Sequence, residues 1–299
     1  MEYSPGLRGV IAGETKISTV GMEGTSLRYR GYDAIKLTET HTYEDAASLI
    51  ISDDLDGSEF TNNFIKYYGE LTNDKDINKL FVEIKSRLHP MDVIRTVVSY
   101  IGDSDKNSDL ESTTKILAAV SYVIASYNDN DTSELDQEYT VASSMLSNKV
   151  STDELQALDD ILILYAEHGF NASTFATRVT ASTRSDLTSS IVSGIGTLKG
   201  ELHGGANERA VELINSFKDI NDAETGVLKM LEEKKKIMGF GHGVYKIQDP
   251  RSPVVKRWVE KLVSDDDSKL RFEIAKKIDE IMDKEKKLFP NVDFYGGLL

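Results

Sequence analysis

Glycine directly follows three of the five histidines in the sequence: His168, His203 and His242. Because glycine has no side chain, it lets a substrate approach the neighbouring imidazole ring closely and lets the backbone adopt positive φ angles. Imidazole also exchanges protons near neutral pH. These three residues are therefore candidates for catalysis or binding, whereas His41, in a polar turn, and His89, at an expected helix start, are more typical of structural histidines.

A zinc site is the obvious alternative use of three histidines and a carboxylate. No two histidines have the His-x-x-x-His spacing that places two ligands on one helix face, and the sequence has no cysteine. It also lacks a Gly-x-Ser-x-Gly turn, a Gly-x-Gly-x-x-Gly run after a strand and a phosphate loop ending in Gly-Lys-Ser/Thr. We therefore expect no bound metal, no serine or thiolate nucleophile, and no nicotinamide or ATP chemistry.

A carboxylate near the end of the sequence completes the set of candidate residues. Asp293 lies among aromatic and small residues in FPNVDFYGG, residues 289–297. It is either a partly buried carboxylate that can act as a base or an ordinary turn residue. Because it lies six residues before Leu299, we expect this segment to fray unless other parts of the chain hold it.

Composition excludes several classes of partner. The sequence has 299 residues, with 35 Lys+Arg against 50 Asp+Glu, and its formal net charge of −15 opposes binding to nucleic-acid phosphates. Its N-terminus lacks the basic and apolar regions of a targeting signal, and no apolar stretch approaches the ~20 residues that a membrane span needs. We expect a soluble, cytoplasmic protein that binds neither nucleic acid nor a membrane.

The elements that must position the candidate residues are mostly helical. Short β-branched and aromatic runs predict strands only at residues 9–12, 17–20 and 26–30. Later apolar residues recur at helical spacing, with Thr42 as a cap for residues 43–51 and Pro90 in the first turn of another helix. Further helices are predicted around residues 116–124, 155–164, 206–214, 254–262 and 270–282. The predicted class is mainly α, with polar loops at residues 52–58, 103–109, 128–133 and 264–268.

Several motifs together resemble one family, the citrate synthases of the shorter bacterial and archaeal type, which include 2-methylcitrate synthases. These motifs are PGLRGVIAGET (residues 5–15), YRGYD (29–33), HPMD (89–92), AEHGFNAST (166–174), KGELHGGANE (199–208), MGFGHGVYK (238–246) and NVDFY (291–295). They occur in the family's order and cover essentially the whole chain.

The resemblance implies an all-α homodimer that condenses acetyl-CoA with oxaloacetate to form citrate and CoA, without a cofactor. It implies a large helical domain over residues 1–203 and a small one over 204–299, near the change to a Gly/His-rich composition at Gly200. The dimer interface is expected to include the helix near Leu155 and residues 182–198, where small residues permit close helix approach. Two alternatives stay open: a 2-methylcitrate synthase, or a non-catalytic dimeric scaffold with this fold.

The resemblance also assigns roles to individual residues. His203 would bind the acetyl-CoA carbonyl and stabilise the enol, Asp293 would remove the methyl proton, and His242 would polarise the oxaloacetate ketone. The residues expected to hold oxaloacetate are His168, Asn171 and Arg251, and Lys246 is expected near the CoA phosphates.

The sequence departs from the family pattern at a few positions. Glu201 stands where the family nearly always has Pro, Gly243 where bacterial members usually have Arg, and Gly296 where Ser is usual. Family members continue beyond the position of Leu299 and contribute two further substrate-binding arginines there. An arginine–carboxylate pair contributes about 1.5–3 kcal/mol, so we expect weaker oxaloacetate binding and slower turnover than in full-length relatives.

Overall fold

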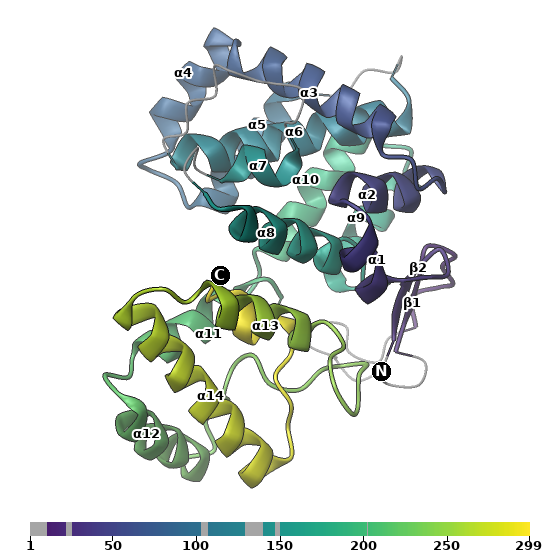
Figure 1. Ribbon diagram of the computed structural model, residues 1–299. Coiled ribbons are helices and arrows are strands. Elements are labelled where there is room, and N and C mark those ends of the chain that lie inside the picture. Colours follow the sequence, from purple (N-terminus) through teal and green to yellow (C-terminus); the bar gives the residue numbers. More distant parts are fainter. Residues whose placement is uncertain (1–10, 22–25, 103–106, 129–139, 147–149, 202) are drawn as a thin grey trace. The chain divides into compact units, whose positions relative to one another are not determined.

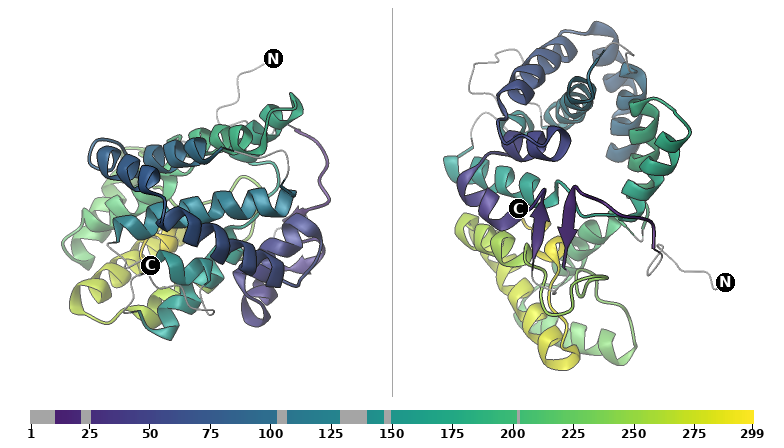
Figure 2. Two further views of the ribbon diagram at one scale, coloured as in Figure 1. Left: turned by 90° about the horizontal axis from the view of Figure 1, so that it is seen from above. Right: turned by 90° about the vertical axis from the view of Figure 1, so that its right-hand side faces the viewer.

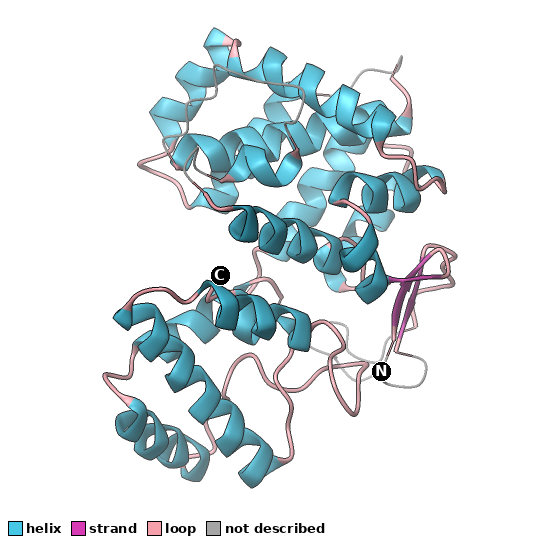
Figure 3. Ribbon diagram, viewed as in Figure 1, coloured by secondary structure: helices cyan, strands magenta, loops and turns pink. Residues whose placement is uncertain are grey.

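The computed structural model describes residues 11–21, 26–102, 107–128, 140–146, 150–201 and 203–299. Helices dominate them, with one small sheet, which confirms the predicted mainly α class (Figures 1 and 3). The chain divides into two compact units. The larger unit contains Ile11–Ser18 and Tyr29–Lys199, and the smaller unit contains Thr19–Arg28 and Gly200–Leu299. None of the helices formed by the described residues combines the length and apolar character needed to cross a membrane.

The sheet has three short strands in the order β1 (Ser18–Val20), β2 (Leu27–Tyr29) and β3 (Tyr32–Asp33). Two predicted strands therefore exist. The third, at residues 9–12, is wrong where it can be judged, because Ile11 and Ala12 form no strand and Ile11 is 95% exposed. A β-branched run without a neighbouring strand has no partner for its backbone N–H and C=O groups. Residues 5–10 of the first family motif lie outside the described residues.

The larger unit is built around one long helix. This helix, α6, buries residues around most of its circumference and packs against α2, α3, α5, α7 and α10. Alanines and serines on α6 allow that close packing. The helices of this unit are α1 (Ala34–Thr40), α2 (Tyr43–Ser52), α3 (Ser58–Thr72), α4 (Lys75–Ile84), α5 (Pro90–Ile101), α6 (Asp109–Tyr127), α7 (Val141–Met145), α8 (Thr152–Tyr165), α9 (Ala172–Ser182) and α10 (Leu187–Leu198).

The smaller unit consists mainly of helices, and a long loop separates α12 from α13. Its helices are α11 (Gly205–Asn215), α12 (Ile220–Glu232), α13 (Ser252–Leu262), α14 (Asp266–Lys286) and α15 (Val292–Gly296). Helix α14 packs against α11 and α12, and α15 packs against α11 and α13 (Figures 1 and 2). The short α15 is thus enclosed by two longer helices that precede it by many residues.

Helix starts follow the sequence signals closely. Thr42 and Asp45 form a capping box at the start of α2, and His89 caps α5 with Pro90 in its first turn, as predicted. The predicted loop at residues 264–268 is wrong in part. Asp265 caps α14, whose first turn carries Asp266 and Asp267. Acidic residues are stabilising there because they face the positive end of the helix dipole. Residues 103–106 and 129–133 of two other predicted loops lie outside the described residues.

Two buried carboxylates join helices of the larger unit. Glu44 accepts a hydrogen bond of 2.8 Å from the Val141 backbone N–H, and Asp159 accepts one of 3.1 Å from the Tyr43 N–H. Burial raises the pKa of Asp159 to about 7, and the nearby charge of Glu44 also raises it. Burial also raises the pKa of Glu44. Burial therefore makes both carboxylates easier to protonate than exposed carboxylates.

We expect Asp159→Asn to stabilise the protein above neutral pH. The folded-state pKa of about 7 lies above the unfolded value of ~3.9, so the contribution of Asp159 to stability falls as the pH rises from about 4 to about 7. Asparagine keeps the acceptor for Tyr43 but does not ionise. The free energy of unfolding at pH 8, measured with denaturant, should rise by about 1–4 kcal/mol, and its pH dependence should flatten. The control is Glu70→Gln, an exposed carboxylate on α3. Equal pH slopes in the wild type and Asp159→Asn would contradict this account.

Candidate active site

Backbone pairing joins the segment that carries His242 to the segment that carries Asp293. Phe240 and Pro290 form an antiparallel bridge. The flanking bonds run from Gly241 N to Phe289 O (2.8 Å), from Asn291 N to Gly239 O (2.9 Å) and from Asn291 Nδ2 to Gly241 O (3.1 Å). The two segments lie about fifty residues apart in the sequence, yet the smaller unit holds them side by side.

Two glycines make this pairing sterically feasible. Gly239 and Gly241 have φ angles of +83° and +72°, which side chains rarely allow. At Gly239 a Cβ atom would also meet Phe294 of α15 at 2.8 Å. Gly239 therefore serves the close approach of α15, whereas Gly241 is needed for its positive φ angle.

The His242 ring is oriented by its own loop. Its Nδ1 atom accepts hydrogen bonds of 3.1 Å from the backbone N–H groups of Val244 and Tyr245. Since Nδ1 is an acceptor, the proton of the neutral ring lies on Nε2, which makes Nε2 a hydrogen-bond donor. The Tyr245 ring lies against the imidazole, with 4.6 Å between ring centroids.

Asp293 lies at the second position of α15, and several contacts hold this helix. Its backbone N–H donates to the Asn291 side chain, which caps the helix at 3.0 Å. Phe294 and Tyr295 are fully buried, and the Tyr295 hydroxyl donates to Asp279 Oδ2 at 2.8 Å. We expected the segment of Asp293 to fray unless other parts of the chain hold it. These contacts within the smaller unit hold it.

His203 precedes helix α11, which packs against α15. The residue is half-buried, and its backbone N–H donates to the Gly200 carbonyl at 2.9 Å. Burial lowers the pKa of His203, and the negative charge of Asp293 partly opposes that shift. The two predicted catalytic residues, ninety positions apart, are thus close enough to interact electrostatically. At neutral pH the imidazole of His203 is mainly uncharged.

Arg251 lies at the start of α13 and is buried in an ion pair with Asp249. Its Nε and Nη2 atoms donate to Asp249 Oδ1 and Oδ2 at 2.9 and 2.8 Å, and its backbone N–H donates to Oδ1 at 3.1 Å. Burial alone would raise the pKa of Asp249, but the hydrogen bonds and charge of Arg251 hold this pKa below its usual range. One edge of the guanidinium therefore faces a protein carboxylate, so a substrate carboxylate would have to meet another edge.

Lys246 lies in an exposed part of the His242 loop. Its Nζ atom donates to the Gly243 carbonyl at 3.0 Å, and the neighbouring Val244 and Ile247 are 45% and 69% exposed. Apart from Gly243 itself and its two chain neighbours, no atom of the described residues lies within 4 Å of the position a Gly243 Cβ would occupy, so the glycine that replaces the usual arginine leaves open space.

His168 and Asn171 belong to the larger unit, whereas the other five candidates belong to the smaller unit. They lie in the turn between α8 and α9, where Asn171 caps α9 by accepting from the Thr174 N–H (2.9 Å) and the Ser173 hydroxyl (2.8 Å). Its side-chain oxygen is thus committed to the cap, and its amide nitrogen is the group that could donate to a ligand. Tyr29 supports the turn by donating to the Ile163 carbonyl at 2.8 Å.

Sequence reasoning missed Asp249 and Asn291, which organise this site. Each lies two residues before a candidate, in Asp249-Pro250-Arg251 and Asn291-Val292-Asp293, and each accepts a hydrogen bond from the backbone N–H two residues on. This spacing is the signature of an Asx turn and could have identified both residues.

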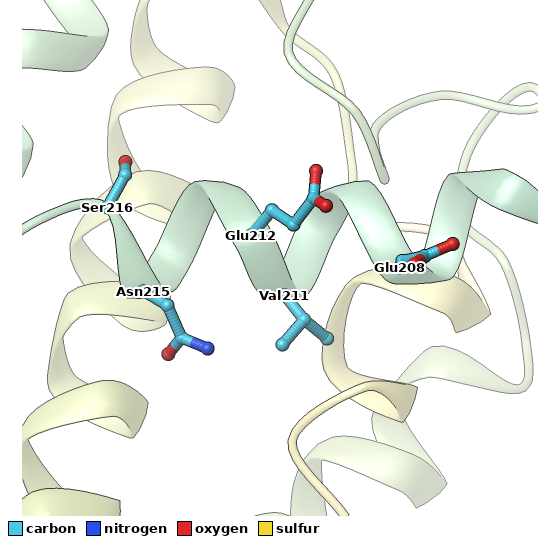
Figure 4. Close-up of a pocket in the computed structure, with 5 residues that line it drawn as sticks. All are labelled: Glu208, Val211, Glu212, Asn215 and Ser216. Atoms are coloured by element: carbon cyan, nitrogen blue, oxygen red, sulfur yellow. The ribbon is translucent and has the colours of Figure 1, made fainter. Parts of the chain in front are cut away.

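A hollow of about 570 Å³ lies on α11, and none of the seven candidate residues lines it. Its lining consists of Glu208, Val211, Glu212, Asn215 and Ser216 (Figure 4). Two carboxylates and no cation make this hollow a poor receptor for a phosphorylated or dicarboxylic ligand. Among the described residues, no group of three or more histidine and acidic side chains is placed to hold a metal ion.

Comparison with known sequences identifies the relatives of this chain. Residues 6–299 match the sequence profile of the family described as citrate synthase, C-terminal domain. A 2-methylcitrate synthase of Shewanella oneidensis is 41% identical, over 97% of this chain and 81% of the relative. A citrate/2-methylcitrate synthase of Bacillus subtilis is 35% identical, over 99% of this chain and 84% of the relative.

Solved structures give the same result. Citrate synthase from Thermotoga maritima aligns with a TM-score of 0.82 at 31% identity, covering 99% of this chain and 83% of that one. Citrate synthase from Thermoplasma acidophilum, in a ternary complex with carboxymethyl coenzyme A and oxaloacetate, aligns with a TM-score of 0.86 at 26% identity, covering 99% and 84%.

A histidine titration tests the proximity of His203 and Asp293. We expect the pKa of His203, followed by NMR, to lie below the ordinary value, and Asp293→Asn to lower it further by removing the charge that opposes the shift. The control Glu285→Gln, an exposed position on α14, should leave it unchanged. A rise of the His203 pKa in Asp293→Asn would show that the two side chains do not interact as described.

Proposed function

The chain belongs to the citrate synthase family, and from this premise we propose that it condenses acetyl-CoA with oxaloacetate to form citrate and CoA. Members of the family are acyltransferases. The observation that best supports the proposal is the pairing of a carboxylate, Asp293, with a histidine of lowered pKa, His203, within one compact unit. The same unit presents His242 with its ring held as a donor.

The first chemical step would be removal of a methyl proton from the thioester. This methyl group is a very weak acid, so a carboxylate can deprotonate it only where the developing oxyanion meets a donor that is already in place. Asp293 would take the proton, and the neutral ring of His203 would donate to the thioester oxygen. The lowered pKa suits this role, because a neutral imidazole donates a hydrogen bond without transferring its proton completely.

The second step would join the enol carbon to the ketone carbon of oxaloacetate. The Nε2–H group of His242 would polarise the ketone oxygen and stabilise its negative charge as the carbon–carbon bond forms. Water would then hydrolyse the thioester of the product, releasing citrate and CoA. Excluding water until the first bond has formed would protect the enol from wasteful protonation.

Substrate binding would use the remaining predicted residues. Arg251 would meet a carboxylate of oxaloacetate with a guanidinium edge other than the one on Asp249, and His168 and the Asn171 amide nitrogen would donate to the same substrate. Lys246, on its exposed loop, would face the CoA phosphates. In a chain with a net charge of −15, such local cations would have to supply all attraction for anionic substrates.

Propionyl-CoA is the second candidate donor. The relative from Shewanella oneidensis is named a 2-methylcitrate synthase, and the one from Bacillus subtilis a citrate/2-methylcitrate synthase. The proposed chemistry is the same for both donors, because only one carbon beside the thioester is deprotonated. A pocket discriminates a single methylene by only about 1–3 kcal/mol, so activity with both donors is expected.

We further propose a homodimer that uses α8 and α10. Ile191, Val192 and Ile195 of α10 are only partly covered, and α9, beside it, buries none of its residues. One of the small residues in the segment 182–198 is needed for packing within the chain. A Cβ atom at Gly194 would overlap the Thr177 hydroxyl of α9. Close approach of α9 and α10 thus accounts for Gly194. The partly covered Ile191, Val192 and Ile195 would contact the partner subunit.

Sedimentation at micromolar concentration should give twice the chain mass of 33.2 kDa. Val192→Asp should shift the species toward the monomer, because it places a charge in an apolar contact, whereas the control Asn62→Asp, at an exposed position on α3, should not. A wild-type protein that sediments only as a monomer would refute the dimer.

Activity is tested by release of the CoA thiol in the presence of oxaloacetate and either acyl-CoA. Asp293→Asn should abolish product formation and leave oxaloacetate binding, measured by calorimetry, nearly intact, since Asp293 acts on the donor. His203→Ala should behave alike, with rate losses of at least about 10²-fold. Wild-type turnover no greater than that of Asp293→Asn would favour the alternative of a non-catalytic scaffold.

A further inference from the structure

Asp249 is fully buried and accepts hydrogen bonds from two parts of the candidate site. One part is Arg251, whose guanidinium and backbone N–H both donate to it. The other is the backbone N–H of Val292, which donates to Oδ2 at 3.1 Å. Val292 is the residue directly before Asp293 and the first residue of α15. A single carboxylate thus contacts both the arginine and the base-bearing helix.

We propose that Asp249 is a positioning residue that fixes the Arg251 guanidinium and the Asp293 carboxylate relative to each other. This inference rests on the proposed function, in which Arg251 holds oxaloacetate and Asp293 deprotonates the donor. By sharing one anchor, the group that binds the acceptor and the group that activates the donor are kept in register. A displacement of about 1 Å at a reacting group costs on the order of 10²-fold in rate, so such an anchor has a large effect.

The geometry separates Asp249 from an ordinary buried ion pair. A carboxylate that only neutralised Arg251 would need no contact with α15, yet Oδ2 receives both Arg251 Nη2 and the Val292 N–H. Helix α15 has only five residues, so its own hydrogen bonds cannot hold it. At its far end the Tyr295 hydroxyl donates to Asp279, while at its start Asp249 receives the first N–H group.

Asp249 has two sets of contacts, one with Arg251 and one with the Val292 N–H, which we call the two arms of the anchor. Each arm can be removed independently by substitution. Val292→Pro removes the N–H donor to Asp249 and replaces the buried valine side chain with a proline ring. Proline suits the first position of a helix, where its fixed φ angle is already helical. The extended conformation of Asn291, with φ −84° and ψ 178°, is the one preferred before proline. Arg251→Lys keeps the charge and removes the bidentate contact. Asp249→Asn weakens both arms.

Steady-state kinetics should resolve the two arms. Arg251→Lys should raise the KM for oxaloacetate by about tenfold or more, with a smaller effect on kcat. Val292→Pro should leave that KM within about twofold and lower kcat by about 10–100-fold. It should also increase the deuterium isotope effect with methyl-deuterated acetyl-CoA, because proton removal becomes slower. Asp249→Asn should show both changes.

A second readout does not require turnover. Because the charge of Asp293 raises the pKa of His203, displacing Asp293 should lower that pKa in Val292→Pro and Asp249→Asn, as in Asp293→Asn. Arg251→Lys should leave it unchanged. The control is Ile278→Val, a fully buried position in α14 that lowers the melting temperature without removing a polar contact. It should change neither the KM nor the His203 pKa.

The outcomes are distinct. An unchanged His203 pKa and unchanged isotope effect in a folded Val292→Pro protein would overturn the proposal. A lowered His203 pKa and an increased isotope effect in the control Ile278→Val would also overturn it. If Asp249→Asn does not fold, Val292→Pro and Arg251→Lys still decide the two arms. The wild-type protein could lack turnover while the His203 pKa still shifts as expected in Val292→Pro and Asp249→Asn. That result would support the positioning role and reject the proposed catalytic function.

Discussion

The hydrogen bonds to the buried Asp249 carboxylate are the contacts on which the arrangement of the smaller unit depends. Removing a carboxylate from water is costly, and the protein offsets this cost with a bidentate arginine and two backbone N–H groups. All four donors come from two segments, the start of α13 and the start of α15. Because an unpaired buried charge is strongly unfavourable, these segments are effectively required to stay together.

The same unit accounts for the electrostatic state of its histidines. His203 is kept neutral by burial, while its position near Asp293 limits how far its pKa falls. His242 is kept as an Nε2 donor by two backbone N–H groups that occupy Nδ1. Neither imidazole needs a positive charge to donate a hydrogen bond. A neutral donor paired with a carboxylate suits enol chemistry better than an imidazolium, which would form a stable ion pair with Asp293 and weaken it as a base.

Local signals in the sequence were sufficient for most of the fold. Thr42 and Pro90 marked helix starts because their effects on the backbone are local. The acidic run at residues 264–268 misled the prediction, since aspartate favours both loops and helix N-termini and only Asp265 acts as a cap. The glycines beside the histidines pointed to candidate residues, but they did not show the purpose of the nearby Gly239. Gly239 is explained by the approach of Phe294, a contact between distant residues that no local pattern encodes. The partner of Arg251 was missed although it lies two residues away, because the sequence shows the charge of Asp249 and not its burial.

Amide hydrogen exchange at Val292 tests most directly whether Asp249 holds α15 in place. If the bond to the buried carboxylate persists in solution, this N–H should exchange as slowly as the amides of buried residues in α14, such as Ile278, because both would open only when the unit unfolds. Exchange of the Val292 amide within about tenfold of the unfolded-peptide rate, while the Ile278 amide stays protected, would show that α15 opens by itself and would contradict the account.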